Sequence, residues 1–167
     1  IFIPYIQQLQ LENLTFAAPD VGSANRIREM ASYFNAEMVI CDKHRKRANE
    51  IASMVVIGDV AGREVVLIDD ICDTGGTLAK AAGLLKDKGA TSVRALCTHP
   101  VLSGNAYKNI ENSALEELVV CDTIPLRQES KKIKVLSVAE LFAIAIRNAY
   151  ENRSITSLFI HSQLRNR

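Results

Sequence analysis

Residues 65–77 of the chain read Val-Val-Leu-Ile-Asp-Asp-Ile-Cys-Asp-Thr-Gly-Gly-Thr. The first four form an apolar run typical of a buried strand, and the residues after Thr77 have a helical pattern. Three carboxylates, on Asp69, Asp70 and Asp73, therefore follow a strand and precede a glycine turn and a helix. Ligands of open α/β sheets bind beyond the carboxyl ends of the strands. We therefore expect a binding site at this loop.

The loop predicts a ligand with two chemically different ends. Gly75 and Gly76 allow positive φ and a close approach of the backbone. Successive amides and a helix N-terminus attract an anion such as phosphate. The aspartates would repel phosphate, but carboxylates accept hydrogen bonds from sugar hydroxyls or bind a divalent metal. A sugar phosphate satisfies both halves, whereas a turn whose aspartates only cap the helix would crowd like charges.

Two other segments also follow predicted strands and should reach the same edge of the sheet. Residues 42–47 read Asp-Lys-His-Arg-Lys-Arg, which predicts a cationic loop. Such cations suit phosphoryl transfer, where charge spreads over phosphate oxygens, although a run of charges is also typical of a solvated loop. Asp20 follows the predicted strand 14–18 and is a candidate metal ligand, the alternative being a turn-forming aspartate after Pro19.

Predicted strands and helices alternate along the chain. Strands are expected at 14–18, 37–41, 52–57, 65–68, 93–97, 118–121 and 134–136, and helices at 23–34, 78–89, 105–112 and 138–152. In the last helix, Ser137 and Glu140 have the spacing of a capping box. This alternation predicts an α/β fold, with a mostly parallel sheet flanked by helices on both faces. A length of 167 residues fits one domain.

The net charge and the spacing of the cysteines limit the classes of protein to which this chain can belong. The net charge of +1 gives no sign of a nucleic-acid partner or of a membrane surface. None of the four cysteines, Cys41, Cys72, Cys97 and Cys121, forms a CxxC pair, so we expect buried, reduced thiols in a cytoplasmic protein. Because the first residue is Ile1 within an unremarkable apolar stretch, we also expect a piece of a longer protein.

The acidic glycine loop, residues 69–77, resembles the ribose 5-phosphate loop shared by type I phosphoribosyltransferases and ribose-phosphate diphosphokinases, the PRPP synthetases. Residues 42–45 resemble the catalytic flexible loop of the bacterial-type (class I) synthetases, and residues 19–22 resemble their PDxG segment. The segments 97–106 and 154–159 resemble the stretch after the next strand and the C-terminal tail. The resemblance runs in order over nearly the whole chain.

This resemblance implies a type I phosphoribosyltransferase-like fold, with residues 1–167 as a single domain that forms the C-terminal half of a two-domain synthetase. The implied reaction transfers the diphosphoryl group of ATP to the 1-hydroxyl of ribose 5-phosphate, giving PRPP and AMP for nucleotide biosynthesis. It also implies Mg2+ as cofactor, phosphate as a candidate activator, and cytoplasmic homohexamers built from dimers. Tail residues such as Thr156 and Phe159 would belong to an allosteric site at subunit contacts.

By the same resemblance, Lys43 and Arg45 stabilise the transferring diphosphoryl group, and Arg45 also belongs to the ribose 5-phosphate site. Asp69 and Asp70 hold ribose hydroxyls, and Asp20 holds magnesium. The 5-phosphate is wrapped by the remaining loop residues, Asp73, Thr74, Gly75, Gly76 and Thr77.

The chain departs from the pattern of the synthetases mainly in lacking their N-terminal half, which brings adenine-binding residues, so we expect these residues alone to be inactive. Ser23 and His44 replace a glycine and an arginine at positions without an assigned role. Two alternatives stay open. One is a phosphoribosyltransferase that uses PRPP, although no segment is recognisable as a hood over a base. The other is a non-catalytic half or regulatory homologue that binds ribose 5-phosphate.

Overall fold

The computed structural model describes residues 1–47 and 50–159, and the side chains of residues 43–52 lie outside the description. The elements along the chain are α1 (Phe2–Leu9), β1 (Leu14–Ala18), the 3-10 turn η1 (Val21–Ser23), α2 (Ala24–Phe34), β2 (Glu37–Arg47), β3 (Glu50–Ile57), β4 (Glu64–Cys72), α3 (Gly76–Asp87), β5 (Ser92–Pro100), α4 (Ala106–Glu111), β6 (Leu118–Cys121), β7 (Ile133–Leu136), α5 (Ala139–Tyr150) and the 3-10 turn η2 (Thr156–Leu158).

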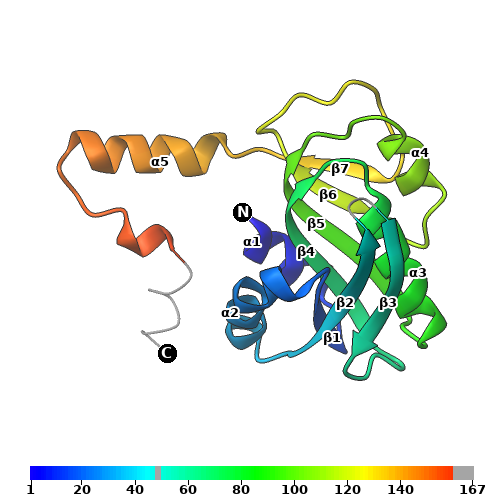
Figure 1. Ribbon diagram of the computed structural model, residues 1–167. Coiled ribbons are helices and arrows are strands. Elements are labelled where there is room, and N and C mark those ends of the chain that lie inside the picture. The colour runs from blue at the N-terminus through cyan, green and yellow to red at the C-terminus, as the bar shows by residue number, and fades with distance from the viewer. Residues whose placement is uncertain (48–49, 160–167) are drawn as a thin grey trace.

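One seven-stranded sheet has the order β3-β2-β1-β4-β5-β6-β7 (Figure 1). Every neighbouring pair is parallel except β2 with β3. The predicted mostly parallel α/β sheet is therefore confirmed. From β1 the chain moves outward to β2 and β3, and then returns to place β4 on the other side of β1. This reversal of direction opens a crevice at the carboxyl ends of β1 and β4, where open α/β sheets bind their ligands.

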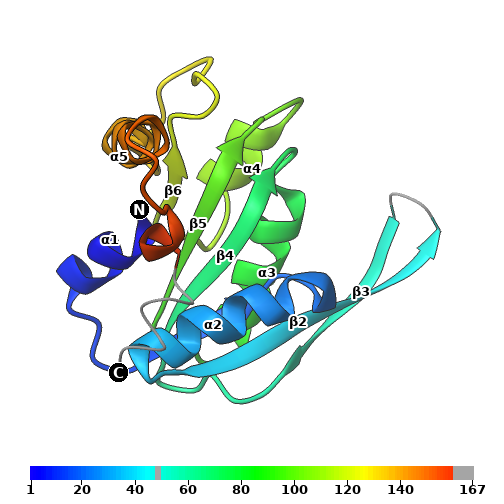
Figure 2. The same ribbon diagram turned by 90° about the vertical axis from the view of Figure 1, so that its left-hand side faces the viewer.

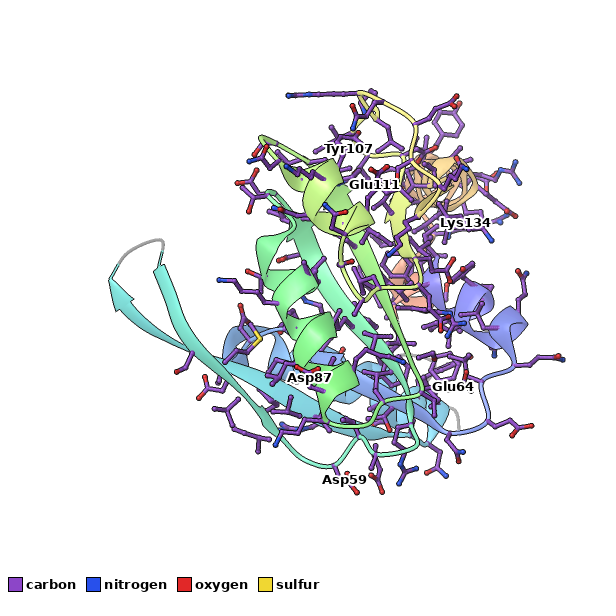
Figure 3. The ribbon with its side chains drawn as sticks, turned by 90° about the vertical axis from the view of Figure 1, so that its right-hand side faces the viewer. Asp59, Glu64, Asp87, Tyr107, Glu111 and Lys134 are labelled. Carbon is purple, nitrogen blue, oxygen red and sulfur yellow. The ribbon has the colours of Figure 1, made fainter. Side chains whose placement is uncertain are left out.

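Helices cover both faces of the sheet (Figure 2). On one face α1 and α2 bury Ile6 and Ile27 against Phe16 of β1. On the other face α3 buries Leu85 within a second apolar cluster, which α4 joins through Ile110. Strands buried on both faces read as continuous apolar runs, which explains the pattern of the central strands. Glu64, which starts β4, lies at one end of the sheet, and Tyr107 of α4 lies at the other, where the strands end (Figure 3).

The basic segment 42–47 is not a loop, and in this respect the prediction was wrong. β2 continues to Arg47 and pairs antiparallel with β3, with Asp42 opposite Val55. The second strand of the hairpin supplies the main-chain hydrogen-bond partners that a lone basic segment would lack. The outer part of this hairpin extends beyond the rest of the sheet (Figure 2).

The start of α5 differs from the predicted one, because Asp122, which is distant in sequence, supplies part of its cap. Val138 is the N-cap of α5 and makes no side-chain capping bond, so the predicted capping box is wrong. The Val138 amide donates to Asp122 Oδ1 at 2.8 Å, and the Ala139 amide donates to Ser137 Oγ at 3.2 Å. Ser23 likewise makes no side-chain cap for α2. A cap supplied by Asp122, 16 residues away in sequence, leaves no local sequence signature.

Helix α1, near the start of the chain, packs against the sheet, whereas helix α5, near its end, does not bury any residue. The apolar N-terminal stretch forms α1, which buries Tyr5 and Ile6. Helix α5 projects away from the sheet (Figure 1), and none of its residues is buried. Phe142 is 56% exposed and Tyr150 is 88% exposed. Within residues 1–47 and 50–159, no helix is long and apolar enough to cross a membrane.

Candidate functional site

A cavity of about 260 Å3 opens at the carboxyl ends of β1 and β4. Its wall comes from the residue after β1, the end of β4, the glycine turn and the first turn of α3. The lining residues are Asp20, Asp69, Asp70, Ile71, Cys72, Asp73, Thr74, Gly75, Thr77 and Leu78. The fold therefore brings Asp20 together with the acidic glycine loop, as the sequence predicted. Gly76 lies within the same turn as the first residue of α3.

Asp20 is held by the chain that follows it. Pro19 ends β1, and Asp20 then adopts an extended conformation as N-cap of the 3-10 turn Val21–Ser23. Its Oδ1 accepts a hydrogen bond of 3.0 Å from the Ser23 amide, and the Ser23 hydroxyl donates to the Asp20 carbonyl oxygen at 2.9 Å. The carboxylate is therefore fixed at the edge of the cavity.

The adjacent carboxylates Asp69 and Asp70 have different environments. Burial, joined by the charges of Asp70 and Asp20, raises the pKa of Asp69 to about 6, against the opposing hydrogen bond from the Asp70 amide. Burial also opposes ionisation of Asp70, but hydrogen bonds from Arg26 and Asp69 outweigh it and hold the pKa of Asp70 below its ordinary value. The site thus contains one strongly ionised carboxylate beside a more basic one.

Arg26 was missed by the sequence reasoning. Its Nη2 atom lies 3.1 Å from Asp70 Oδ2, so from α2 it contacts a side chain that lines the cavity. Arg26 also lines a neighbouring hollow of about 800 Å3 between α1, α2 and α5. No local signal identifies it, because Arg28 on the same helix has the same chemistry and yet bonds to its neighbour Asn25.

The glycine turn requires its glycine at position 75. Gly75 has φ +70°, and a Cβ at this position would lie 3.1 Å from Ile110 Cδ1 and 3.4 Å from the Ala106 carbonyl oxygen. The turn therefore packs closely against α4. Helix α3 starts directly after it, so its N-terminal amides and positive dipole end face the cavity that Thr77 lines.

The carboxylate of Asp73 accepts a hydrogen bond from the Ser103 hydroxyl, which follows β5. Cys72 lies beneath the loop. Burial, aided by the charges of Asp69 and Asp73, raises the pKa of the Cys72 thiol to about 12, while a hydrogen bond from the Gly75 amide opposes the shift. All four cysteines are buried and free. A thiol that stays protonated is a poor nucleophile, so Cys72 serves as packing.

The backbones of Lys43 and Arg45 lie in the part of β2 that follows its last pair with β1, Ile40 opposite Ala18, and they pair with Met54 and Ile51 of β3. Their side chains fall in the part of the chain outside the description, so the role assigned to them stays a prediction.

Oxygen ligands suit Mg2+, which commonly takes one or two carboxylates together with substrate phosphates and water. Within the described ranges, no group of three His, Cys, Asp or Glu side chains gathers closely enough to hold a metal by itself. Asp20 lies in a cavity with the crowded pair Asp69 and Asp70. The donor set therefore fits a magnesium ion that a bound phosphate helps to hold.

The family model described as phosphoribosyl synthetase-associated domain matches residues 21–160. A ribose-phosphate pyrophosphokinase of Wolinella succinogenes is 54% identical over 160 residues, which are 96% of this chain and 52% of the relative. A ribose-phosphate pyrophosphokinase of Campylobacter jejuni is 51% identical, with the same two shares. The chain thus spans about half the length of the curated relatives it matches.

Solved structures agree with this relationship. The crystal structure of phosphoribosylpyrophosphate synthetase from Mycobacterium smegmatis superposes with a TM-score of 0.81 at 33% identity, covering 89% of this chain and 49% of that one. The adenine phosphoribosyl transferase of Trypanosoma brucei, solved with AMP, pyrophosphate and ribose-5-phosphate, has a TM-score of 0.54 at 19% identity, covering 86% and 73%. At that identity the second likeness concerns the fold alone.

Proposed function

Since this chain belongs to the phosphoribosyl synthetase family, on the match over residues 21–160, we propose that it is the ribose 5-phosphate-binding half of a ribose-phosphate diphosphokinase. The whole protein would transfer the diphosphoryl group of ATP to the 1-hydroxyl of ribose 5-phosphate, giving PRPP and AMP. The observation that carries the proposal is the cavity, where carboxylates and a glycine turn at a helix N-terminus line one wall.

The two ends of ribose 5-phosphate match the two chemistries of this cavity. The loop from Asp73 to Thr77 offers amides and the start of α3 to the 5-phosphate. Asp69 and Asp70 accept hydrogen bonds from the ribose hydroxyls. Ionised Asp70 is the stronger acceptor, because Arg26 favours its charged form.

With both ends held, the 1-hydroxyl is oriented toward incoming ATP. Its oxygen bonds to the β-phosphorus of ATP, the bond between the α,β-bridging oxygen and that phosphorus breaks, and the hydroxyl proton is released. Positioning and charge neutralisation supply most of the catalysis in such transfers. Lys43 and Arg45 are assigned to the neutralisation, because their strand continues past the carboxyl end of β1, the end of the sheet at which the cavity opens. Asp20 is assigned to magnesium, which would neutralise phosphate charge when bound.

The activity would belong to a protein of the length of the relatives, since the chain spans about half of them. Residues 1–167 then form one phosphoribosyltransferase-like domain, and ATP capture falls mainly to the other half. Assembly into cytoplasmic homohexamers, and activation by phosphate, belong to the same proposal. Identities of 51% and 54% to pyrophosphokinases, against 19% to a phosphoribosyltransferase, favour the synthetase reaction.

Calorimetric titration of the chain with ribose 5-phosphate, with and without magnesium, tests the proposal. The wild-type chain should bind, and the double variant Asp73→Ala, Thr77→Ala should bind at least about tenfold more weakly, since it loses the Thr77 hydroxyl and the bond from Ser103 to the Asp73 carboxylate that holds the loop. Asp87→Ala, at the far end of α3 (Figure 3), is the matched control. 2-Deoxyribose 5-phosphate should bind more weakly than ribose 5-phosphate, because a carboxylate loses its hydroxyl partner.

A folded wild-type chain that binds neither sugar phosphate would contradict the assignment of the site. Formation of AMP by the chain alone, incubated with ATP, ribose 5-phosphate and magnesium, would contradict the proposal that ATP is bound mainly by the other half of the longer protein. In a protein of the relatives' length, Lys43→Ala and Arg45→Ala should each lower kcat by about 10²–10³. Binding without any turnover in that longer protein would instead favour a regulatory homologue.

A further inference from the structure

The loop that begins at Cys72, the last residue of β4, is hydrogen-bonded to residues 101–109. This segment consists of the connection after β5 and the first turn of α4. Three consecutive carbonyl oxygens of the loop accept hydrogen bonds from it. The Leu102 amide donates to Cys72 O at 3.0 Å, the Ser103 amide to Asp73 O at 3.0 Å, and the side-chain amide of Asn109 to Thr74 O at 2.8 Å.

These bonds fix the directions of the loop amides. The C=O and N–H groups of a trans peptide point in opposite directions, and the described residues contain no cis peptide. Once the carbonyl oxygens of Cys72 and Asp73 are turned toward segment 101–109, the amides of Asp73 and Thr74 must point away from it. The Gly75 amide is directed at the Cys72 sulfur. Successive amides on one side of a turn form an anion-binding concavity.

The segment keeps an unfavourable conformation to make these bonds. Leu102 has φ +45° and is buried, although leucine rarely adopts the left-handed region. Its conformation directs two successive amides, its own and that of Ser103, at the loop. Strained residues persist where the surrounding structure holds them, and they cluster at functional sites.

From this geometry we infer that Asn109 is a positioning residue for the phosphate-binding loop. Two of the three bonds come from main-chain amides and do not depend on a side chain, whereas the Thr74 carbonyl depends on the side chain of Asn109. Without Asn109 that carbonyl can rotate toward the cavity, where its oxygen would repel the 5-phosphate. The inference rests on the proposed function and adds to it a residue that lies outside the wall of the cavity.

The test uses the wild-type chain and the variants Asn109→Ala, Asn109→Asp and Asn112→Ala. Asn109→Asp keeps the shape but replaces the donor with an oxygen facing a carbonyl oxygen. Asn112→Ala is the control, because Asn112 is exposed on the end of the same helix. Dissociation constants for ribose 5-phosphate and for inorganic phosphate are measured by titration. We expect both to rise about tenfold in Asn109→Ala and further in Asn109→Asp.

A spectroscopic readout separates positioning from a general loss of structure. The amide proton resonance of Gly75, which shares its peptide group with the Thr74 carbonyl, should move in Asn109→Ala and stay in place in Asn112→Ala, whereas the amide resonances of Asp73 and Thr74, whose peptide groups are held by Leu102 and Ser103, should stay in place in both variants. If Asn109→Ala binds within twofold of wild type with unchanged amide shifts, the inference is wrong and the proposed function stands. If the folded wild-type chain binds neither ligand, both the proposed function and this inference are wrong.

Discussion

The guanidinium of Arg26 lies 3.1 Å from the carboxylate of Asp70, although 44 residues separate them in sequence. Their side chains are 52% and 53% exposed, so the pair adds little to the free energy of unfolding. Its consequence is electrostatic, since it keeps the pKa of Asp70 low against the opposing effect of burial, while the pKa of Asp69 is raised.

Replacing Arg26 should make Asp70 more basic. In Arg26→Ala the pKa of Asp70 is expected to rise, because burial then acts without the opposing hydrogen bond and charge of Arg26. Affinity for ribose 5-phosphate should fall about three- to tenfold, as expected for one charge-assisted contact. Carboxyl ¹³C NMR titration measures the pKa. Arg28→Ala is the control, since Arg28 lies on the same helix and bonds to Asn25. An unchanged pKa of Asp70 would show that Arg26 has no such influence.

The raised pKa of Asp69 predicts a stability difference that depends on pH. The folded state holds the Asp69 proton more tightly than the unfolded state, so ionised Asp69 destabilises the fold above pH 6 and has no effect below about pH 4. Asp69→Asn should therefore raise the free energy of unfolding at pH 7.5 in magnesium-free buffer. We expect about 1 kcal/mol, discounted because the side chain is only partly buried. The gain should vanish near pH 4.

Urea unfolding at the two pH values measures this difference. Asp122→Asn is a control for which the opposite change in stability is expected. Hydrogen bonds from Ser137 and from the Val138 amide lower the pKa of Asp122, so its substitution should reduce stability at pH 7.5. A gain for Asp69→Asn that is equal at both pH values would mean that ionisation is not its source.

The glycine turn should tolerate no side chain. Gly75→Ala places a Cβ 3.1 Å from Ile110 Cδ1 at a φ of +70°. We expect a loss of about 1–3 kcal/mol in stability and the loss of ribose 5-phosphate binding. Gly83→Ala is the matched control. It lies within α3 with open space around it, so it should stabilise the chain by about 0.5–1 kcal/mol. Thermal unfolding and calorimetric titration measure both effects, and equal behaviour of the two variants would refute this account.

Helix α5 should contribute little to the stability of this chain. Phe142→Ala removes a side chain that is 56% exposed on a helix without buried residues. We expect a change below about 0.5–1 kcal/mol, against about 2–5 kcal/mol for Leu85→Ala in the core between α3 and the sheet. Urea unfolding of both variants gives the comparison. A cost for Phe142→Ala as large as that for Leu85→Ala would mean that α5 packs on the body in solution.

Much of the fold was predictable because its signals are local. The apolar runs of β1 and β6 were predicted with their observed bounds, Leu14–Ala18 and Leu118–Cys121. The alternation of strands and helices predicted the parallel sheet, and the acidic glycine loop predicted a site at its carboxyl edge. The extension of β2 to Arg47 was not predictable from residues 42–47, because its hydrogen-bond partners come from β3.

The sequence by itself determined which chemical groups the site contains, because the aspartates, the glycines and the strand before them lie within one short segment. Only the tertiary structure decided which groups act on them. Arg26 reaches Asp70 from α2, Asn109 reaches the Thr74 carbonyl from α4, and both contacts exist because helices on opposite faces of the sheet begin at the same edge. A hydrogen bond or ion pair depends on distance in space, and a sequence pattern records only distance along the chain.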